Sequence, residues 1–112
     1  MSVVRFPKRV PLSIVPTQIH HLPRLTRLLG GPEIFMKRDD LTGCAMTGNK
    51  VRKLEFLCAE AIRRGATTLM TCGGVQSNHA RTTAVAAARL GMKSILFLRG
   101  QCPQTTQGNL LL

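Results

Sequence analysis

The second half of the chain alternates helical and strand patterns in short, regular steps. From Val51, apolar residues recur at intervals of three and four until Gly65, which is typical of an amphipathic helix closed by a glycine. Residues 66–72 have strand composition, residues 77–90 form an alanine-rich helical pattern, and residues 93–98 have strand composition again. This order predicts an α/β fold in which helices flank a parallel sheet and right-handed crossovers connect its strands.

The first part of the chain carries weaker patterns. Prolines punctuate residues 1–18, which predicts an extended lead-in. A short helical pattern follows over residues 20–29 and ends at two glycines. Residues 33–38 have strand composition, and we expect them to supply the first strand of the parallel sheet.

The chain ends in a way that is unusual for a natural domain. A hydrophobic share of 44% is enough to form a core, yet the last three residues are leucines with no polar tail. We therefore expect a fragment of a longer protein, truncated at residue 112. Residues 1–45 would be an N-terminal segment that contributes to the larger domain, and residues 46–112 would begin the α/β domain.

The net charge of +11 makes nucleic acid the first partner to consider. The basic residues are spread along the chain in runs no longer than two, and the chain has four Phe, no Tyr and no Trp. Recognition of single strands normally needs more aromatic side chains for stacking. A small basic nucleic-acid-binding module stays open as an alternative function, but the dispersed charge argues against it.

Acidic and cysteine residues do not form a metal-binding pattern. Asp39 and Asp40 stand beside Arg38 without a third ligand nearby, so we interpret them as a structural turn with a helix-capping role. The cysteines are too far apart for a zinc site and are typical of a reduced, cytoplasmic protein: Cys44, Cys58, Cys72 and Cys102. No stretch reaches the roughly 18 apolar residues of a membrane span.

Two stretches contain residues that are typical of a catalytic or ligand-binding site. Lys50 follows the small turn formed by Thr47, Gly48 and Asn49, and it has Arg52 and Lys53 as basic neighbours. A lysine amine becomes a useful nucleophile beside other cations or in a dry pocket, because its reference pKa is about 10.4. The same residues also fit the solvated face of an ordinary helix.

The second stretch is a glycine-led loop that joins a predicted parallel strand to a predicted helix. Ligands of α/β proteins bind at this place, where the first helix amides suit a carboxylate or phosphate. Ser77 or Asn78 could serve simply as an N-cap. That role does not explain four consecutive hydrogen-bonding side chains, which are Gln76, Ser77, Asn78 and His79.

Three ordered motifs make a family resemblance specific. They are Lys-Arg-Asp-Asp-Leu-Thr at residues 37–42, Gly-Asn-Lys-Val-Arg-Lys-Leu-Glu at 48–55 and Gly-Gly-Val-Gln-Ser-Asn-His-Ala-Arg at 73–81. Together they closely resemble the pyridoxal-phosphate enzymes of the 1-aminocyclopropane-1-carboxylate deaminase and D-cysteine desulfhydrase family. The resemblance covers the chain from about residue 6 to residue 112.

The resemblance implies part of a fold-type-II, tryptophan synthase β-like enzyme. Such an enzyme is a homodimeric lyase that uses pyridoxal 5'-phosphate to release ammonia and a 2-oxo acid from a small amino acid. The substrate would be of the D-cysteine or 1-aminocyclopropane-1-carboxylate type. His79 looks more like the desulfhydrase branch than the deaminase branch, although one position does not decide the substrate.

The resemblance also implies residue roles. Lys50 would form the internal aldimine and then shuttle the α-proton, and Lys53 would reach the cofactor phosphate. Asn78 would hydrogen-bond the phenolic oxygen of the cofactor, and Ser77 would act as an acid-base group. The backbone amides of residues 76–79 would hold the substrate carboxylate.

The chain departs from the family pattern in two respects. Thr47 stands where the family often has glycine, which implies a differently shaped turn before Lys50. The family's phosphate loop, the group facing the pyridine nitrogen and the substrate-binding tyrosines lie beyond residue 112. A catalytically inactive fragment is therefore a further alternative.

Overall fold

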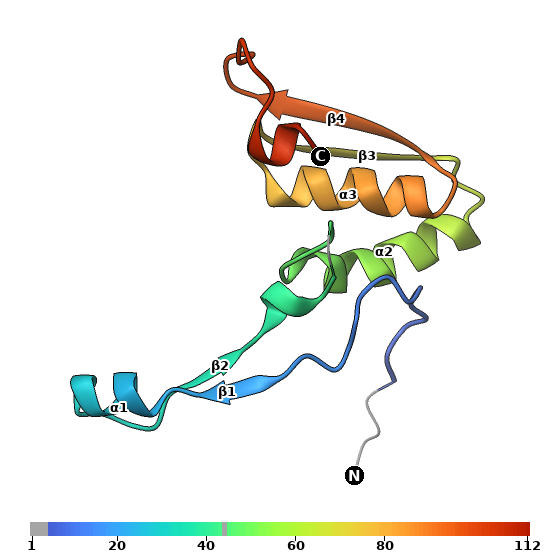
Figure 1. The fold of residues 1–112 in the computed structure, drawn as a ribbon. Helices are drawn as coiled ribbons and strands as arrows, with labels where there is room; N and C mark the ends of the chain where they lie inside the picture. The colour runs from blue at the N-terminus through green and yellow to red at the C-terminus, as the bar shows by residue number, and fades with distance from the viewer. Residues whose placement is uncertain (1–4, 44) are drawn as a thin grey trace.

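A computed structural model describes residues 5–43 and 45–112 of the chain (Figure 1). The first four residues of the predicted lead-in and Cys44 lie outside the described residues. Within the described part, the strands form a two-stranded antiparallel sheet and a two-stranded parallel sheet. None of the helices in this part is long and apolar enough to span a membrane.

The antiparallel sheet joins strand β1 (Ile19–His21) to strand β2 (Phe35–Lys37), with helix α1 (Pro23–Leu29) between them. The prediction that residues 33–38 begin the parallel sheet is therefore wrong, because this strand pairs with β1 instead. The backbone bonds continue past the strands: the Arg38 amide donates to Gln18 O at 2.9 Å. Figure 1 shows this hairpin extending away from the other helices and strands.

Helix α1 begins three residues later than the helical pattern predicted. Pro23 occupies its first turn, where the missing amide costs nothing. The residue before a proline is disfavoured in the helical region, and Leu22 has φ −112° and ψ 70°. His20 and His21 consequently belong to β1.

The parallel sheet forms the centre of the second half. Strand β3 (Thr68–Gly74) pairs with strand β4 (Lys93–Arg99), in a register that runs from Thr68 opposite Lys93 to Gly74 opposite Arg99. Helix α3 (Asn78–Arg89) is the crossover between them and packs on one face of the sheet, and helix α2 (Lys50–Arg63) packs on α3 (Figure 1). The predicted parallel α/β arrangement is confirmed for these elements.

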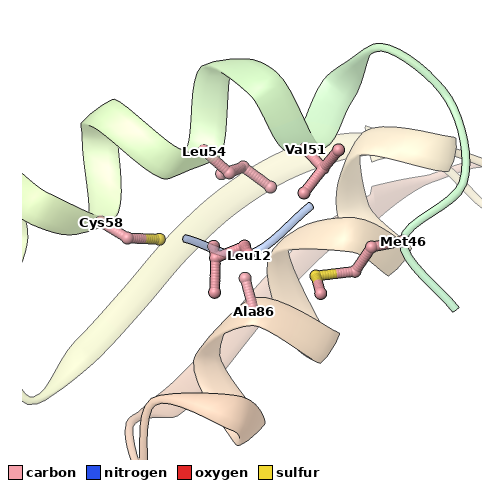
Figure 2. Close-up of a cluster of buried hydrophobic side chains, with 6 residues drawn as sticks. All are labelled: Leu12, Met46, Val51, Leu54, Cys58 and Ala86. Carbon is pink, nitrogen blue, oxygen red and sulfur yellow. The ribbon is translucent and has the colours of Figure 1, made fainter. Parts of the chain in front are cut away.

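The core lies mainly between α2 and α3 (Figure 2). Val51, Leu54 and Cys58 recur at helical spacing on α2 and meet Ala86 of α3. The alanines of α3 permit this close approach because they add little side-chain volume. Leu12 from the lead-in inserts at the same place, together with Met46.

Glu55 ties the lead-in to α2. Its side chain is 2% exposed, and its Oε1 accepts hydrogen bonds from the amides of Leu12 at 3.0 Å and Ser13 at 2.9 Å. The hydroxyl of Ser13 donates to the same oxygen at 2.7 Å. A buried carboxylate is stable only when such partners replace water. Glu55 therefore fixes the chain segment that carries Leu12 into the core.

Candidate active site

The start of α2, the start of α3 and the carboxyl ends of β3 and β4 lie at one end of the α/β unit (Figure 1). The short helix η2 (Gly108–Leu110) packs against the start of α3 there. Two helix N-termini at one place concentrate amide donors and the positive ends of two helix dipoles. This end of the molecule is therefore suited to an anionic ligand.

The turn that delivers Lys50 is held from both sides. Gly48 has φ +94°, which favours glycine, and its amide donates to Asp39 O at 2.8 Å. The buried hydroxyl of Thr42 lies 3.0 Å from Gly48 O. Lys50 is the first residue of α2, and its Nζ donates to Asn49 Oδ1 at 2.9 Å. The lysine amine thus projects from a turn whose backbone is constrained.

The neighbouring acids bind arginines. Arg52 donates to both carboxylate oxygens of Asp39, at 2.7 and 2.9 Å, and this contact holds the pKa of Asp39 below its usual range. Arg38 binds Asp40 in the same way, at 2.6 to 3.2 Å. The predicted capping role is replaced by ion pairing, and the charge of Arg52 is compensated rather than directed at Lys50. Within residues 5–43 and 45–112, no group of three His, Cys, Asp or Glu residues could hold a metal.

The loop before α3 is closed by Ser77. Its amide donates to Gly74 O at 2.9 Å, and its Oγ accepts from the amide of Ala80 at 3.2 Å. The possible N-cap role of Ser77 is therefore confirmed. Capping uses an oxygen lone pair and not the hydroxyl proton, so the proton remains free to serve a ligand. Helix geometry leaves the amides of Asn78 and His79 without intrahelical acceptors.

Gly73 is required for this loop, and its replacement by alanine tests that requirement. A Cβ on Gly73 would lie 2.5 Å from Ser77 Oγ and 2.6 Å from Ser77 Cβ. We expect Gly73→Ala to displace Ser77 and to lower the free energy of unfolding by about 1–3 kcal/mol, as overpacking does. Gly74→Ala is the matched control, because its Cβ would meet nothing closer than Arg99 O at 3.9 Å. Equal stability of the two variants in urea unfolding would contradict this expectation.

His79, the second residue of α3, lies in an environment that disfavours its positively charged form. Burial lowers its pKa, and the positive charges of Lys53 and Lys50 lower it further. Both effects favour the neutral form of the imidazole. Its buried Nδ1 has no hydrogen-bond partner among the described residues. The grouping of Lys50, Lys53 and His79 in one binding site stays a prediction.

A cavity of about 470 Å³ opens between the Lys50 turn and the start of α3. Sequence reasoning gave no role to Arg81, which lies here and donates to Thr47 O at 3.2 Å and to Asn109 Oδ1 at 2.9 Å. Its position one turn after Ser77 could have indicated that it faces the same site. The cavity is lined by Lys37, Asp39, Asp40, Thr47, Gly48, Asn49, Asn78 and Arg81.

Both polar atoms of the Gln76 side chain form hydrogen bonds within the chain. Its Oε1 accepts from the amide of Asn109 at 2.9 Å, and its Nε2 donates to Gln107 O at 3.0 Å. The side chain therefore holds η2 in place. Asn109 also escaped sequence reasoning, because no local pattern connects it to residues about thirty positions earlier.

Comparisons with known proteins agree with this architecture. The pattern of a family described as pyridoxal-phosphate dependent enzymes matches residues 10–112. A Thermotoga maritima protein provisionally named 1-aminocyclopropane-1-carboxylate deaminase is 52% identical over 93% of this chain and 33% of its own length. The D-cysteine desulfhydrase of Salmonella paratyphi B is 50% identical over 98% of this chain and 34% of its own.

One solved structure is similar over nearly the whole chain. It is described as a homologue of 1-aminocyclopropane-1-carboxylate deaminase, and it matches with a TM-score of 0.86 and 45% identity. The match covers 94% of this chain and 31% of that structure. The chain therefore spans about a third of the length of the relatives it matches.

Proposed function

The chain belongs to the pyridoxal-phosphate-dependent enzyme family, and from this premise we propose that it supplies the lysine-bearing part of a deaminase or desulfhydrase. The substrate would be a small amino acid of the D-cysteine or 1-aminocyclopropane-1-carboxylate type, and the products ammonia and a 2-oxo acid. The observation that carries the proposal is the amine of Lys50 at the start of α2, beside the polar start of α3. The activity is proposed for the protein that carries this chain. The family match does not favour a nucleic-acid-binding module.

The residues present fit the cofactor. An aldehyde needs a primary amine, and Lys50 offers one whose hydrogen-bond partner, Asn49 Oδ1, is another surface group. A phosphate needs positive charge, which Lys53 and the helix N-termini provide. The buried Nδ1 of His79 and Nε of Arg81 are polar atoms without partners among the described residues, and Arg81 lines the cavity.

When bound, pyridoxal phosphate supplies an electron sink for negative charge that develops at the substrate's α-carbon. Lys50 Nζ would hold the cofactor covalently and, once released by the substrate amine, would be placed to hold or move the α-proton. Lys53 would bind the phosphate. Asn78 would donate from its side-chain amide to the phenolic oxygen.

The start of α3 would orient the substrate. The amides of Asn78 and His79 have no intrahelical acceptor, so they can bind a carboxylate at the positive end of the helix dipole. The hydroxyl of Ser77 keeps its proton while capping the helix, so it can donate or transfer that proton.

We also propose a cytoplasmic homodimer, as the family resemblance implies. The described cysteines Cys58, Cys72 and Cys102 are unpaired, which suits a reducing compartment. This part of the proposal is tested by the oligomeric state of the purified protein in solution.

An assay of the protein that carries this chain tests the proposed activity. With pyridoxal phosphate bound, we expect ammonia and a 2-oxo acid in equal amounts from D-cysteine or from 1-aminocyclopropane-1-carboxylate, with sulfide released only from D-cysteine. The L-enantiomer of cysteine is the matched control for recognition at the α-carbon. Bound cofactor without ammonia release from these substrates would contradict the proposed reaction.

A further inference from the structure

Asn109 joins the residues at the start of α3. Its Nδ2 donates to Asn78 Oδ1 at 2.8 Å and to the backbone oxygen of Gln76 at 2.9 Å. The backbone amide of Asn109 donates to Gln76 Oε1 at 2.9 Å, and its side-chain Oδ1 accepts from Arg81 Nη1 at 2.9 Å. One side chain on η2 is therefore held by three residues that precede it by 28 to 33 positions.

The backbone at Gly108, next to Asn109, lies close to the Gln76 side chain. Gly108 has φ +58°, a conformation that favours glycine, and a Cβ there would lie 2.7 Å from Gln76 Oε1. A Cβ would displace the end of the Gln76 side chain, which accepts from the backbone amide of Asn109. The positive φ and this contact together favour glycine at position 108.

The hydrogen bonds have a defined direction. A guanidinium can only donate, so Arg81 requires the oxygen of the Asn109 amide to face it. The nitrogen of Asn109 must then face Asn78 and can only donate to that residue's oxygen. With its oxygen occupied in this way, the Asn78 amide presents its NH₂ group elsewhere. Without Asn109, a rotation of 180° about the last side-chain bond would interchange oxygen and nitrogen at little cost.

We propose that Asn109 is a positioning residue that fixes the side-chain amide of Asn78 so that its NH₂ group points toward the ligand. The inference rests on the proposed function, in which Asn78 donates to the phenolic oxygen of the cofactor. Arg81 donates to the side-chain oxygen of Asn109 and so orients the Asn109 side-chain amide. Asn109 in turn donates to the side-chain oxygen of Asn78, which leaves the Asn78 NH₂ group to donate to the anionic oxygen of the cofactor. Turned the other way, Asn78 would place its own oxygen against that anion.

Asn109→Asp in the protein that carries this chain tests the inference. Aspartate still accepts from Arg81 but cannot donate to Asn78, so the Asn78 amide turns or loses its orientation. A donor to the phenolic oxygen withdraws negative charge, so its loss makes the bound chromophore hold its proton more tightly. We expect the pKa at which the absorbance of bound pyridoxal phosphate changes to rise by about one unit, the size of one hydrogen bond to a charged group.

A double-mutant cycle separates positioning from a general structural role. In an Asn78→Ala background, Asn109→Asp should add no further change to that pKa, because Asn109 acts through Asn78. Asn109→Ala, which also releases Arg81, is a second variant and should raise the pKa in the same direction. Gln107→Ala is the control: it keeps the backbone oxygen that accepts from Gln76 and should leave the pKa unchanged.

The outcomes are distinguishable from a failure of the proposed function. If the unmodified protein binds pyridoxal phosphate and releases ammonia but both Asn109 variants titrate as it does, the inference alone is overturned. An equal shift in the presence and absence of the Asn78 side chain overturns it as well. An unmodified protein that forms no bound chromophore would contradict the proposed function, and this inference with it.

Discussion

Replacing Lys50 by alanine is expected to abolish covalent capture of pyridoxal phosphate and to lower turnover by about a thousandfold or more. The physical reason is that, among residues 5–43 and 45–112, no other amine is delivered by a constrained turn to the start of α3. Lys53 lies one turn further along α2 and has the phosphate as its proposed partner. We therefore expect Lys53→Ala to weaken cofactor affinity while leaving covalent capture in place.

Lys93→Ala is the matched control for Lys50→Ala. Lys93 is an exposed lysine at the amino end of β4, whereas the candidate site lies at the carboxyl end of the sheet. Its loss removes the same charge without touching the site, so absorbance of the bound cofactor and turnover should be unchanged. Unaltered cofactor absorbance in Lys50→Ala would contradict the assignment of Lys50.

Replacing Glu55 by alanine is expected to have the largest effect on stability. The variant leaves the amides of Leu12 and Ser13 without their acceptor next to the core, and each unsatisfied buried donor costs about 1–3 kcal/mol. We expect the free energy of unfolding to fall by about 3 kcal/mol in total. Glu55→Gln keeps one carbonyl oxygen and should be intermediate. Urea unfolding at pH 7 measures all three proteins.

The contribution of Glu55 should depend on pH. Burial raises the pKa of Glu55, but the hydrogen bonds from Ser13 and Leu12 and the charge of Arg9 lower it by more, so the pKa lies below the ordinary value of 4.5. A carboxylate with a lowered pKa in the folded state stabilises the fold above its unfolded pKa. The stability difference between the unmodified protein and Glu55→Gln should therefore persist at pH 7 and shrink as the pH falls below about 4.5.

Glu60→Ala is the control on the same helix. Glu60 binds Arg63 and Arg64 at the surface, and these contacts lower its pKa to about 2. Exposed ion pairs contribute little to stability because water and salt screen them. If Glu55→Ala destabilised the protein no more than Glu60→Ala does, the anchoring role of Glu55 would be wrong.

The helices and the parallel strands could be predicted from the sequence because each has a local signal. The period of α2 and its closing glycine, like the alanines of α3, depend on neighbours within a few positions. Strand β1 could not be predicted in this way. It has three residues, and it exists because β2, which follows helix α1 in the chain, pairs with it. The division of the chain at residue 45 stays a prediction.

The candidate site was predictable to the same extent. The loop before α3 could be recognised because it follows a strand at the carboxyl edge of a parallel sheet, where α/β proteins bind ligands. Lys50 was assigned to the same site by the family resemblance. The compensation of Arg52 by Asp39 and the directed contacts of Asn109 could not be predicted. They depend on pairs of residues that are distant in the sequence and on which atom of a side chain faces its partner.

The location of the covalently bound cofactor tests the central claim most directly. The protein that carries this chain would be incubated with pyridoxal phosphate, reduced with borohydride, digested and analysed by mass spectrometry. We expect a pyridoxyl label on Lys50 that is absent from Lys50→Ala. A label on Lys53 or on another lysine, or no label at all, would contradict it.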